Sequence, residues 1–180
     1  MTVYPLKLSL LVFFLFFYQL SLSQDDAILW SEDLEIEWSD FKGKPQKRKN
    51  IAASISTGIK FSWSTEFVDG KQNFTYTLHA FMNPSESWVL PDKKLNSILE
   101  HERLHFDVTA LVAFRFREAL ENYKPTKHIE KDLSKLYNEF FIMRNKIQSQ
   151  YDFETNHSIN VEKQKEWEMK IKRLLKPYLK

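Results

Sequence analysis

The chain has 180 residues, of which 43% are hydrophobic and 28% are charged, as in ordinary globular proteins. Its formal net charge of +2 is too balanced to indicate binding to nucleic acid. The absence of cysteine excludes disulfides, thiolate metal ligands, a thiol nucleophile and attachment to lipid through a processed cysteine. A metal site in this chain must therefore be built from His, Asp and Glu.

Residues 1–23 have the pattern of a secretory signal peptide. Lys7 is their only charge, and the segment from Leu8 to Leu22 is almost wholly apolar. Ser21 and Ser23 are small residues at the spacing that a signal peptidase recognises, which predicts cleavage after Ser23.

The alternative interpretation of this segment is a retained membrane anchor. Its apolar run of about 15 residues is short for a span that needs roughly 20. We therefore expect a signal peptide at 1–23 and a single domain at 24–180, secreted or periplasmic, with no stable membrane span after cleavage.

The first predicted strand follows the leader. Leu34, Ile36 and Trp38 alternate with glutamates, as in a half-buried strand, and the chain then reaches a turn at Gly43. The basic run at 42–49 is interpreted as a solvated loop, with a substrate or membrane patch as the alternative.

The next segments predict a long β-hairpin. Ile59, Phe61 and Trp63 alternate with polar residues, and the Asp69-Gly70 turn follows. The second strand has one face formed by Phe74, Tyr76, Leu78 and Ala80. His79 lies on its opposite face and is interpreted as a surface histidine.

Three helices are predicted after the hairpin. The first covers 93–122 with Asp92 as its N-cap, and the second covers 127–150 as its antiparallel partner. A polar connector at 151–160 leads to an amphipathic helix at 161–179. The predicted fold class is therefore α+β, with an N-terminal antiparallel sheet packed on the first helix and two further helices.

The first of these helices contains a His-Glu-x-x-His motif formed by His101, Glu102 and His105. At about 100° per residue, the two imidazoles share one helical face and can bind a single zinc ion. Glu102 lies one residue further round the helix, where it can act as general base on a water at that metal. Two helix histidines that are simply satisfied by neighbouring groups are the structural alternative.

A catalytic zinc needs a third protein ligand, and we expect His157, in the polar connector, to supply it. Glu139 and Glu154 are the alternatives. Asp107 is a poor ligand because it points about 200° away from His105 on the helix, and it is expected to support a ligand or the packing instead.

The residues near His157 suggest supporting roles. Asp152 or Glu154 could accept a hydrogen bond from a ligand imidazole, and Tyr151 could donate one to a developing oxyanion. The alternative is that these residues only cap the last helix.

The chemistry expected of this site is peptide hydrolysis with one zinc per chain. The metal would lower the pKa of water towards about 7, and Glu102 would take the proton and return it to the leaving amine. A peptide or protein substrate would add to an edge strand of the hairpin.

Several segments together resemble a family of bacterial secreted proteins with a domain of unknown function, described as zinc-dependent proteases. The matching segments are Trp38–Gly43, Ser87–Val89, Leu99–Asp107, and Tyr151–His157 with Trp167 after it. The resemblance implies a compact zincin-like peptidase domain in a Gram-negative envelope.

Two other functions are compatible with the sequence. One is a non-catalytic envelope protein that keeps a structural metal, and the other is an interaction module whose aromatic-rich sheet is the working surface.

Overall fold

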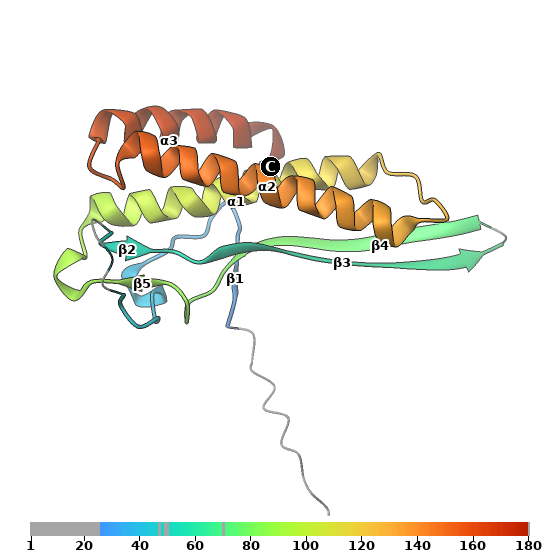
Figure 1. The fold of residues 1–180 in the computed structure, drawn as a ribbon, viewed down its shortest axis with the longest axis horizontal. Coiled ribbons are helices and arrows are strands. Elements are labelled where there is room, and N and C mark those ends of the chain that lie inside the picture. The colour runs from blue at the N-terminus through green and yellow to red at the C-terminus, as the bar shows by residue number, and fades with distance from the viewer. Residues whose placement is uncertain (1–25, 47, 49–50, 70, 180) are drawn as a thin grey trace, which may run out of the picture.

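The computed structural model describes residues 26–46, 48, 51–69 and 71–179. The expected signal peptide lies outside the described residues, as do part of the basic run and Gly70 of the predicted turn. Within the described residues the chain is α+β, as predicted, with a small antiparallel sheet and three long helices (Figure 1).

The predicted hairpin is confirmed and forms most of the sheet. Strand β3 (Thr57–Val68) pairs antiparallel with β4 (Lys71–Met82) along their whole lengths. The short strand β1 (Ile28–Leu29) pairs with the other side of β4, so the strand order is β1-β4-β3. Strand β3 is therefore an edge strand.

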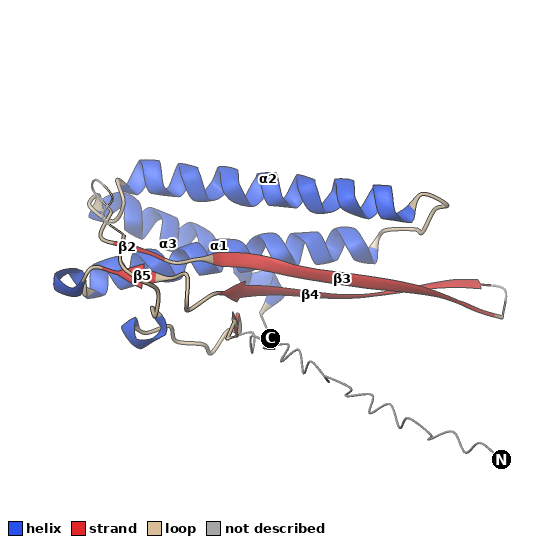
Figure 2. Cartoon of the chain, turned by 60° about the horizontal axis from the view of Figure 1, so that its bottom comes forward, coloured by secondary structure: helices blue, strands red, loops and turns tan. Residues whose placement is uncertain are grey.

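A second, two-stranded sheet lies beside the N-terminal part of the first helix. It pairs β2 (Ala53–Ser54) antiparallel with β5 (Trp88–Val89). Both strands of this pair lie beyond the end of the long hairpin (Figures 1 and 2).

The three helices are α1 (Asn96–Glu121), α2 (Ile129–Thr155) and α3 (Val161–Leu175). All three lie on the same side of the hairpin, with α1 packed against the sheet and α2 running back beside it (Figures 1 and 2). No helix in the described part of the chain combines the length and apolar character needed to cross a membrane.

Helix α1 is the centre of the hydrophobic core. Its middle is buried on nearly every side because the sheet and both other helices contact it, as its apolar pattern predicted. Val108, Val112 and Phe116 have no exposed surface, and Leu78 and Met82 of β4 are buried against the helices. The histidine motif therefore lies on the same helix as the centre of the core, next to its fully buried residues.

The prediction of a strand at Leu34–Trp38 is wrong. The segment is an irregular loop that ends in a short 3₁₀ helix, Trp38–Asp40. Its alternating apolar residues do face inward, since Ile36 is buried, but the carbonyl of Ile36 accepts a hydrogen bond from Arg103 Nε at 2.7 Å instead of from a strand.

Three helix boundaries also differ from the prediction. The last helix, α3, ends at Leu175, and a short 3₁₀ helix, Lys176–Tyr178, follows it. Asp92 belongs to a short 3₁₀ helix, Pro91–Lys93, and Leu95 is the N-cap of α1. Helix α2 continues to Thr155, through the first half of the predicted polar connector. It does so because Tyr151 and Thr155 are fully buried, which makes this last part of α2 a packed helix face.

Candidate metal centre

Helix α1 presents His101, Glu102 and His105 towards a cavity of about 390 Å³ between α1, α2 and the segment around β2. His101 and Glu102 are 3% and 4% exposed. The Nε2 atoms of the two histidines are 3.2 Å apart, so the imidazoles converge as the motif predicted. The burial is costly unless these polar groups are satisfied.

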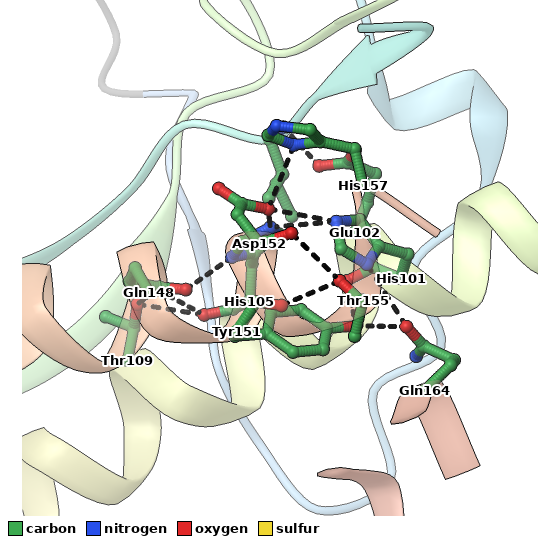
Figure 3. A network of polar contacts seen from close by, with 11 residues as sticks. His101, Glu102, His105, Thr109, Gln148, Tyr151, Asp152, Thr155, His157 and Gln164 are labelled. Carbon is green, nitrogen blue, oxygen red and sulfur yellow. Dashed lines mark hydrogen bonds and ion pairs between the residues drawn. The ribbon is translucent and has the colours of Figure 1, made fainter. Parts of the chain in front are cut away.

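The last turns of α2 bring a carboxylate to the same place. Gln148, Tyr151, Asp152 and Thr155 recur at the spacing of one helical face, and that face packs on α1. Asp152 Oδ1 lies 3.1 Å from His101 Nε2 and 3.0 Å from His105 Nε2. Figure 3 places this carboxylate between the imidazoles.

His157 reaches the cluster through an unusual turn. Asn156, His157 and Ser158 all have positive φ angles, of 48°, 52° and 74°. This turn folds the chain back over the end of α2, and His157 Nδ1 lies 3.4 Å from Asp152 Oδ1. Ligand atoms of His101, Asp152 and His157 all lie within 4.8 Å of one another, so these residues could hold a metal ion.

Two glutamines, the buried Gln164 and the half-buried Gln148, determine which nitrogen of each motif histidine carries a proton. Gln164 Oε1 accepts a hydrogen bond from the Tyr151 hydroxyl at 2.7 Å and lies 3.1 Å from His101 Nδ1. An amide oxygen can only accept, so His101 Nδ1 is the protonated nitrogen and its Nε2 faces the cluster with a lone pair.

The same argument applies to His105. Gln148 Nε2 donates to the His105 carbonyl oxygen at 2.8 Å and to Thr109 Oγ1 at 3.1 Å, which fixes the orientation of the amide. Gln148 Oε1 is then the group that accepts from His105 Nδ1. The lone pair of His105 Nε2 is therefore also directed at Asp152.

These contacts leave two nitrogen lone pairs and a carboxylate oxygen facing one another. A proton taken up by His105 Nε2 could be donated to Asp152. Burial by itself would lower the pKa of His105, but this hydrogen bond and the charge of Glu102 outweigh burial and raise the pKa. Burial would raise the pKa of Asp152, yet its contacts with the imidazoles of His101 and His105 hold it well below its usual range. The site thus favours a positive charge at its centre, and its donor set fits a metal cation.

Glu102 lies beside these ligand atoms without joining them. Its Oε2 accepts a hydrogen bond from the backbone N–H of Ile55 at 2.7 Å, which anchors the carboxylate to the segment between β2 and β3. Glu102 also lines the cavity, together with the motif histidines. One carboxylate oxygen is therefore held in place while the side chain borders open space.

Tyr151 has a different place from the one expected. It is fully buried, it stacks on His101 with ring centroids 4.5 Å apart, and it does not line the cavity. Burial raises the pKa of its hydroxyl well above the usual range, and the hydroxyl hydrogen bonds to Gln164 and to the His101 carbonyl oxygen. Tyr151 packs against the histidines on the side away from the cavity, so it is not positioned as an oxyanion donor.

The alternative third ligands lie elsewhere. Glu139 is exposed and faces Lys135, and Glu154 accepts hydrogen bonds from Gln150 and from Trp167 Nε1 at 2.8 Å. Asp107 accepts from Trp30 Nε1 at 2.8 Å, which fits the packing role expected for it.

The sequence interpretation placed Asp152 beside a ligand and overlooked its position among the ligand atoms. It also missed Gln148 and Gln164. The signal for Asp152 was the spacing of Gln148, Tyr151, Asp152 and Thr155, which marks one helical face once α2 is extended. Gln164 comes from α3, and its pairing with His101 depends on tertiary packing alone.

Comparisons of this chain with protein-family models, with curated proteins and with solved structures find no match. The geometry of the site is therefore the basis for a functional proposal.

Proposed function

We propose that this protein is a secreted, zinc-dependent peptidase with a zincin-like catalytic helix. The observation that carries the proposal is the convergence of His101 Nε2, His105 Nε2 and Asp152 Oδ1 beside Glu102. The resemblance of the motif segments to secreted zinc-dependent proteases points the same way. Nitrogen and carboxylate ligands without sulfur suit zinc.

His101, His105 and Asp152 would hold the zinc, with His157 at the open side of the cluster. Zinc bound there would polarise a substrate carbonyl and make a neighbouring water more acidic. Gln148 and Gln164 keep the ligand nitrogens deprotonated and correctly oriented, which is the usual role of partners behind metal-bound imidazoles.

Glu102 would act as the general base. Its carboxylate is not used as a ligand, and the hydrogen bond from Ile55 keeps it at the edge of the cavity. It would take a proton from the attacking water and pass it to the amine that leaves when the peptide bond breaks. A purely structural metal would have no use for this buried, uncoordinated carboxylate.

Residues 55–57, which lead into β3, offer a strand edge for the substrate backbone. Ser56 O accepts from Asn83 N on the side of β4, so the backbone groups of Ile55 and Thr57 face the opposite, outer edge. Ile55 N–H there donates to Glu102 and Thr57 O accepts from Arg144, which leaves Ile55 O and Thr57 N–H to pair with a substrate. That edge borders the cavity. An extended peptide would pair with it as an added strand.

The decisive experiment is hydrolysis of a broad peptide library by zinc-loaded wild type and Glu102→Gln. The variant should keep its zinc and lose hydrolysis by about 10²-fold to 10⁴-fold, the range typical for removal of a general base. Glu154→Gln is the matched control because it makes the same change on the far side of α2, where the carboxylate contacts Trp167.

The control should hydrolyse peptides as the wild type does. Equal hydrolysis by Glu102→Gln and the wild type would contradict the proposed base. A zinc-loaded wild type that cleaves nothing in the library would favour the non-catalytic envelope protein.

A further inference from the structure

Arg144 of α2 lies at the boundary of the metal cavity with no acidic partner. Its Nη1 donates to the carbonyl oxygen of Thr57 at 2.7 Å, and its Nε is buried without a hydrogen-bond partner. No ion pair involves Arg144 among the residues that the structure describes. Burial lowers its pKa, but an arginine still remains charged.

A half-buried guanidinium with an unpaired, buried Nε is costly, and its planar set of donors is suited to binding a carboxylate. Arg144 lines the same cavity as His101, Glu102, His105 and Asp152. A carboxylate that enters this cavity therefore meets an unpaired cation beside the proposed zinc ligands.

The hydrogen bond to Thr57 also limits how far a substrate can extend along the edge of β3. Thr57 O is a backbone acceptor on the outer edge of the strand, and Arg144 already occupies it. A peptide that pairs with the segment before Thr57 would need the Thr57 carbonyl as its next backbone acceptor, and it would meet the guanidinium of Arg144 there. The chain of the substrate should end at this point.

A second, apolar cavity of about 240 Å³ begins beside the same two residues. Thr57 and Arg144 line both cavities. The walls of the second are mainly Ile59 and the rings of Phe81, Phe116, Tyr137 and Phe140. Such a cavity, with polar groups only from Thr57, Arg144 and the Tyr137 hydroxyl, suits a large apolar side chain.

We infer that the site is built for the carboxyl terminus of a peptide, with a large apolar last residue. This inference rests on the proposed peptidase function and adds the substrate class. The terminal carboxylate binds Arg144, the last side chain fills the apolar cavity, and the last peptide bond lies at the metal ligands. Water adds to the carbonyl carbon, the C–N bond breaks, and Glu102 transfers the proton of the water to the departing amine of the free amino acid.

The test compares two peptides that are identical except that one ends in phenylalanine with a free carboxylate and the other in phenylalanine amide. Wild type should cleave the last peptide bond of the free acid with a kcat/KM at least about tenfold higher, since hydrogen bonds between charged groups are stronger than those to a neutral amide. Arg144→Gln should abolish this preference, and Arg144→Lys should restore part of it.

Arg117→Gln is the matched control. Arg117 of α1 also donates to a strand carbonyl, that of Leu78 at 3.1 Å, and lies over a phenylalanine ring, but it lines a different cavity. It should keep the wild-type preference. Zinc content should be unchanged in all three variants, which excludes loss of the metal as the cause.

Binding of 3-phenylpropionate and of 3-phenylpropionamide to the zinc-loaded protein separates this inference from the proposed function. The acid should bind the wild type at least about tenfold more tightly than the amide, and Arg144→Gln should remove the difference. If no peptide is cleaved but this pattern holds, the peptidase function fails and the carboxylate site stands. If the wild type cleaves the amide as fast as the acid, or the acid binds Arg144→Gln unchanged, the inference is overturned.

Discussion

Asp152 Oδ1 lies 3.1, 3.0 and 3.4 Å from ring nitrogens of His101, His105 and His157. No other carboxylate has such contacts in the part of the chain that the structure describes. The carboxylate supplies the one full negative charge among the proposed ligands, and its charge compensates a divalent cation in a buried site.

Asp152→Asn should therefore weaken zinc binding more than loss of a residue that only hydrogen bonds to a ligand, such as Gln148. We expect at least about a 100-fold fall in affinity, measured by competition with a chelator of known strength. Glu154→Gln, two residues away on an exposed side of α2, should leave the affinity unchanged. Similar affinities in Asp152→Asn and wild type would remove Asp152 from the ligand set.

Gly43 gives a second prediction at the scale of one residue. A Cβ at this position would lie 2.8 Å from the carbonyl oxygens of both Ser85 and Ser87, which are backbone atoms and cannot swing aside. Gly43→Ala should lower the free energy of unfolding by about 1–3 kcal/mol, as overpacking does.

Gly58→Ala is the control for Gly43→Ala. Its Cβ would meet the far end of the Phe81 ring at 2.7 Å, and a side chain can move. Urea unfolding of both variants should give the smaller loss for Gly58→Ala. The reverse order would show that the contact of Gly43 with the 85–87 segment does not limit stability.

At the scale of elements, α2 does more than pack against α1. One face of its last turns carries the carboxylate Asp152, the glutamine that orients His105, and Tyr151 beneath the histidines. The three left-handed residues that follow turn His157 back over this face, at a cost of roughly 1–2 kcal/mol per residue. Such strain persists where the surroundings determine the conformation, often at functional sites.

Gln148→Leu tests how α2 orients His105. Loss of the acceptor for His105 Nδ1 should lower zinc affinity about 10-fold to 100-fold, because the ring is no longer held in one tautomer. Gln148→Glu keeps an acceptor and should bind zinc more tightly than Gln148→Leu. Equal affinity in both variants and the wild type, measured by the same competition, would exclude this orienting role.

The elements that could be predicted were those whose apolar residues recur at a regular spacing along the sequence. The hairpin and the three helices followed from apolar residues at spacings of two or of about 3.6, and the motif residues His101, Glu102 and His105 are brought together on α1. The segment at Leu34–Trp38 has the period of a strand but no neighbouring strand to pair with, so its pattern predicted burial correctly and conformation wrongly.

The end of α2 could not be placed because its residues are mixed in polarity. Asp152 and Gln148 are polar groups on a face that packs on α1, which weakens the amphipathic pattern at the candidate site. His157 was expected near the metal, and the turn that brings it there depends on left-handed residues that no simple pattern marks. The partner of His101, Gln164, required knowledge of how α3 packs.

At the scale of the whole molecule, the proposed metal joins parts of the chain that are distant in sequence. Its proposed ligands come from α1 and from the end of α2, His157 comes from the turn before α3, and Gln164 adds a contact from α3 itself. A metal that binds only the folded state stabilises it, by about 2.7 kcal/mol at a free concentration 100 times its Kd.

Zinc should therefore raise the Tm of the metal-free protein by about 5–10 °C, and a chelator should reverse the change. Glu102→Gln should show the same shift because Glu102 is not a proposed ligand. Calorimetry with and without zinc measures both. A zinc-independent Tm would contradict a metal that joins α1 to the end of α2.

The most direct test of the whole account is the zinc content of the purified protein. After titration with zinc and removal of the excess, wild type and Glu102→Gln should retain about one zinc per chain, while Asp152→Asn should retain far less under the same conditions. A wild type that retains no zinc, or an Asp152→Asn variant that retains as much as the wild type, would contradict the proposed metal centre.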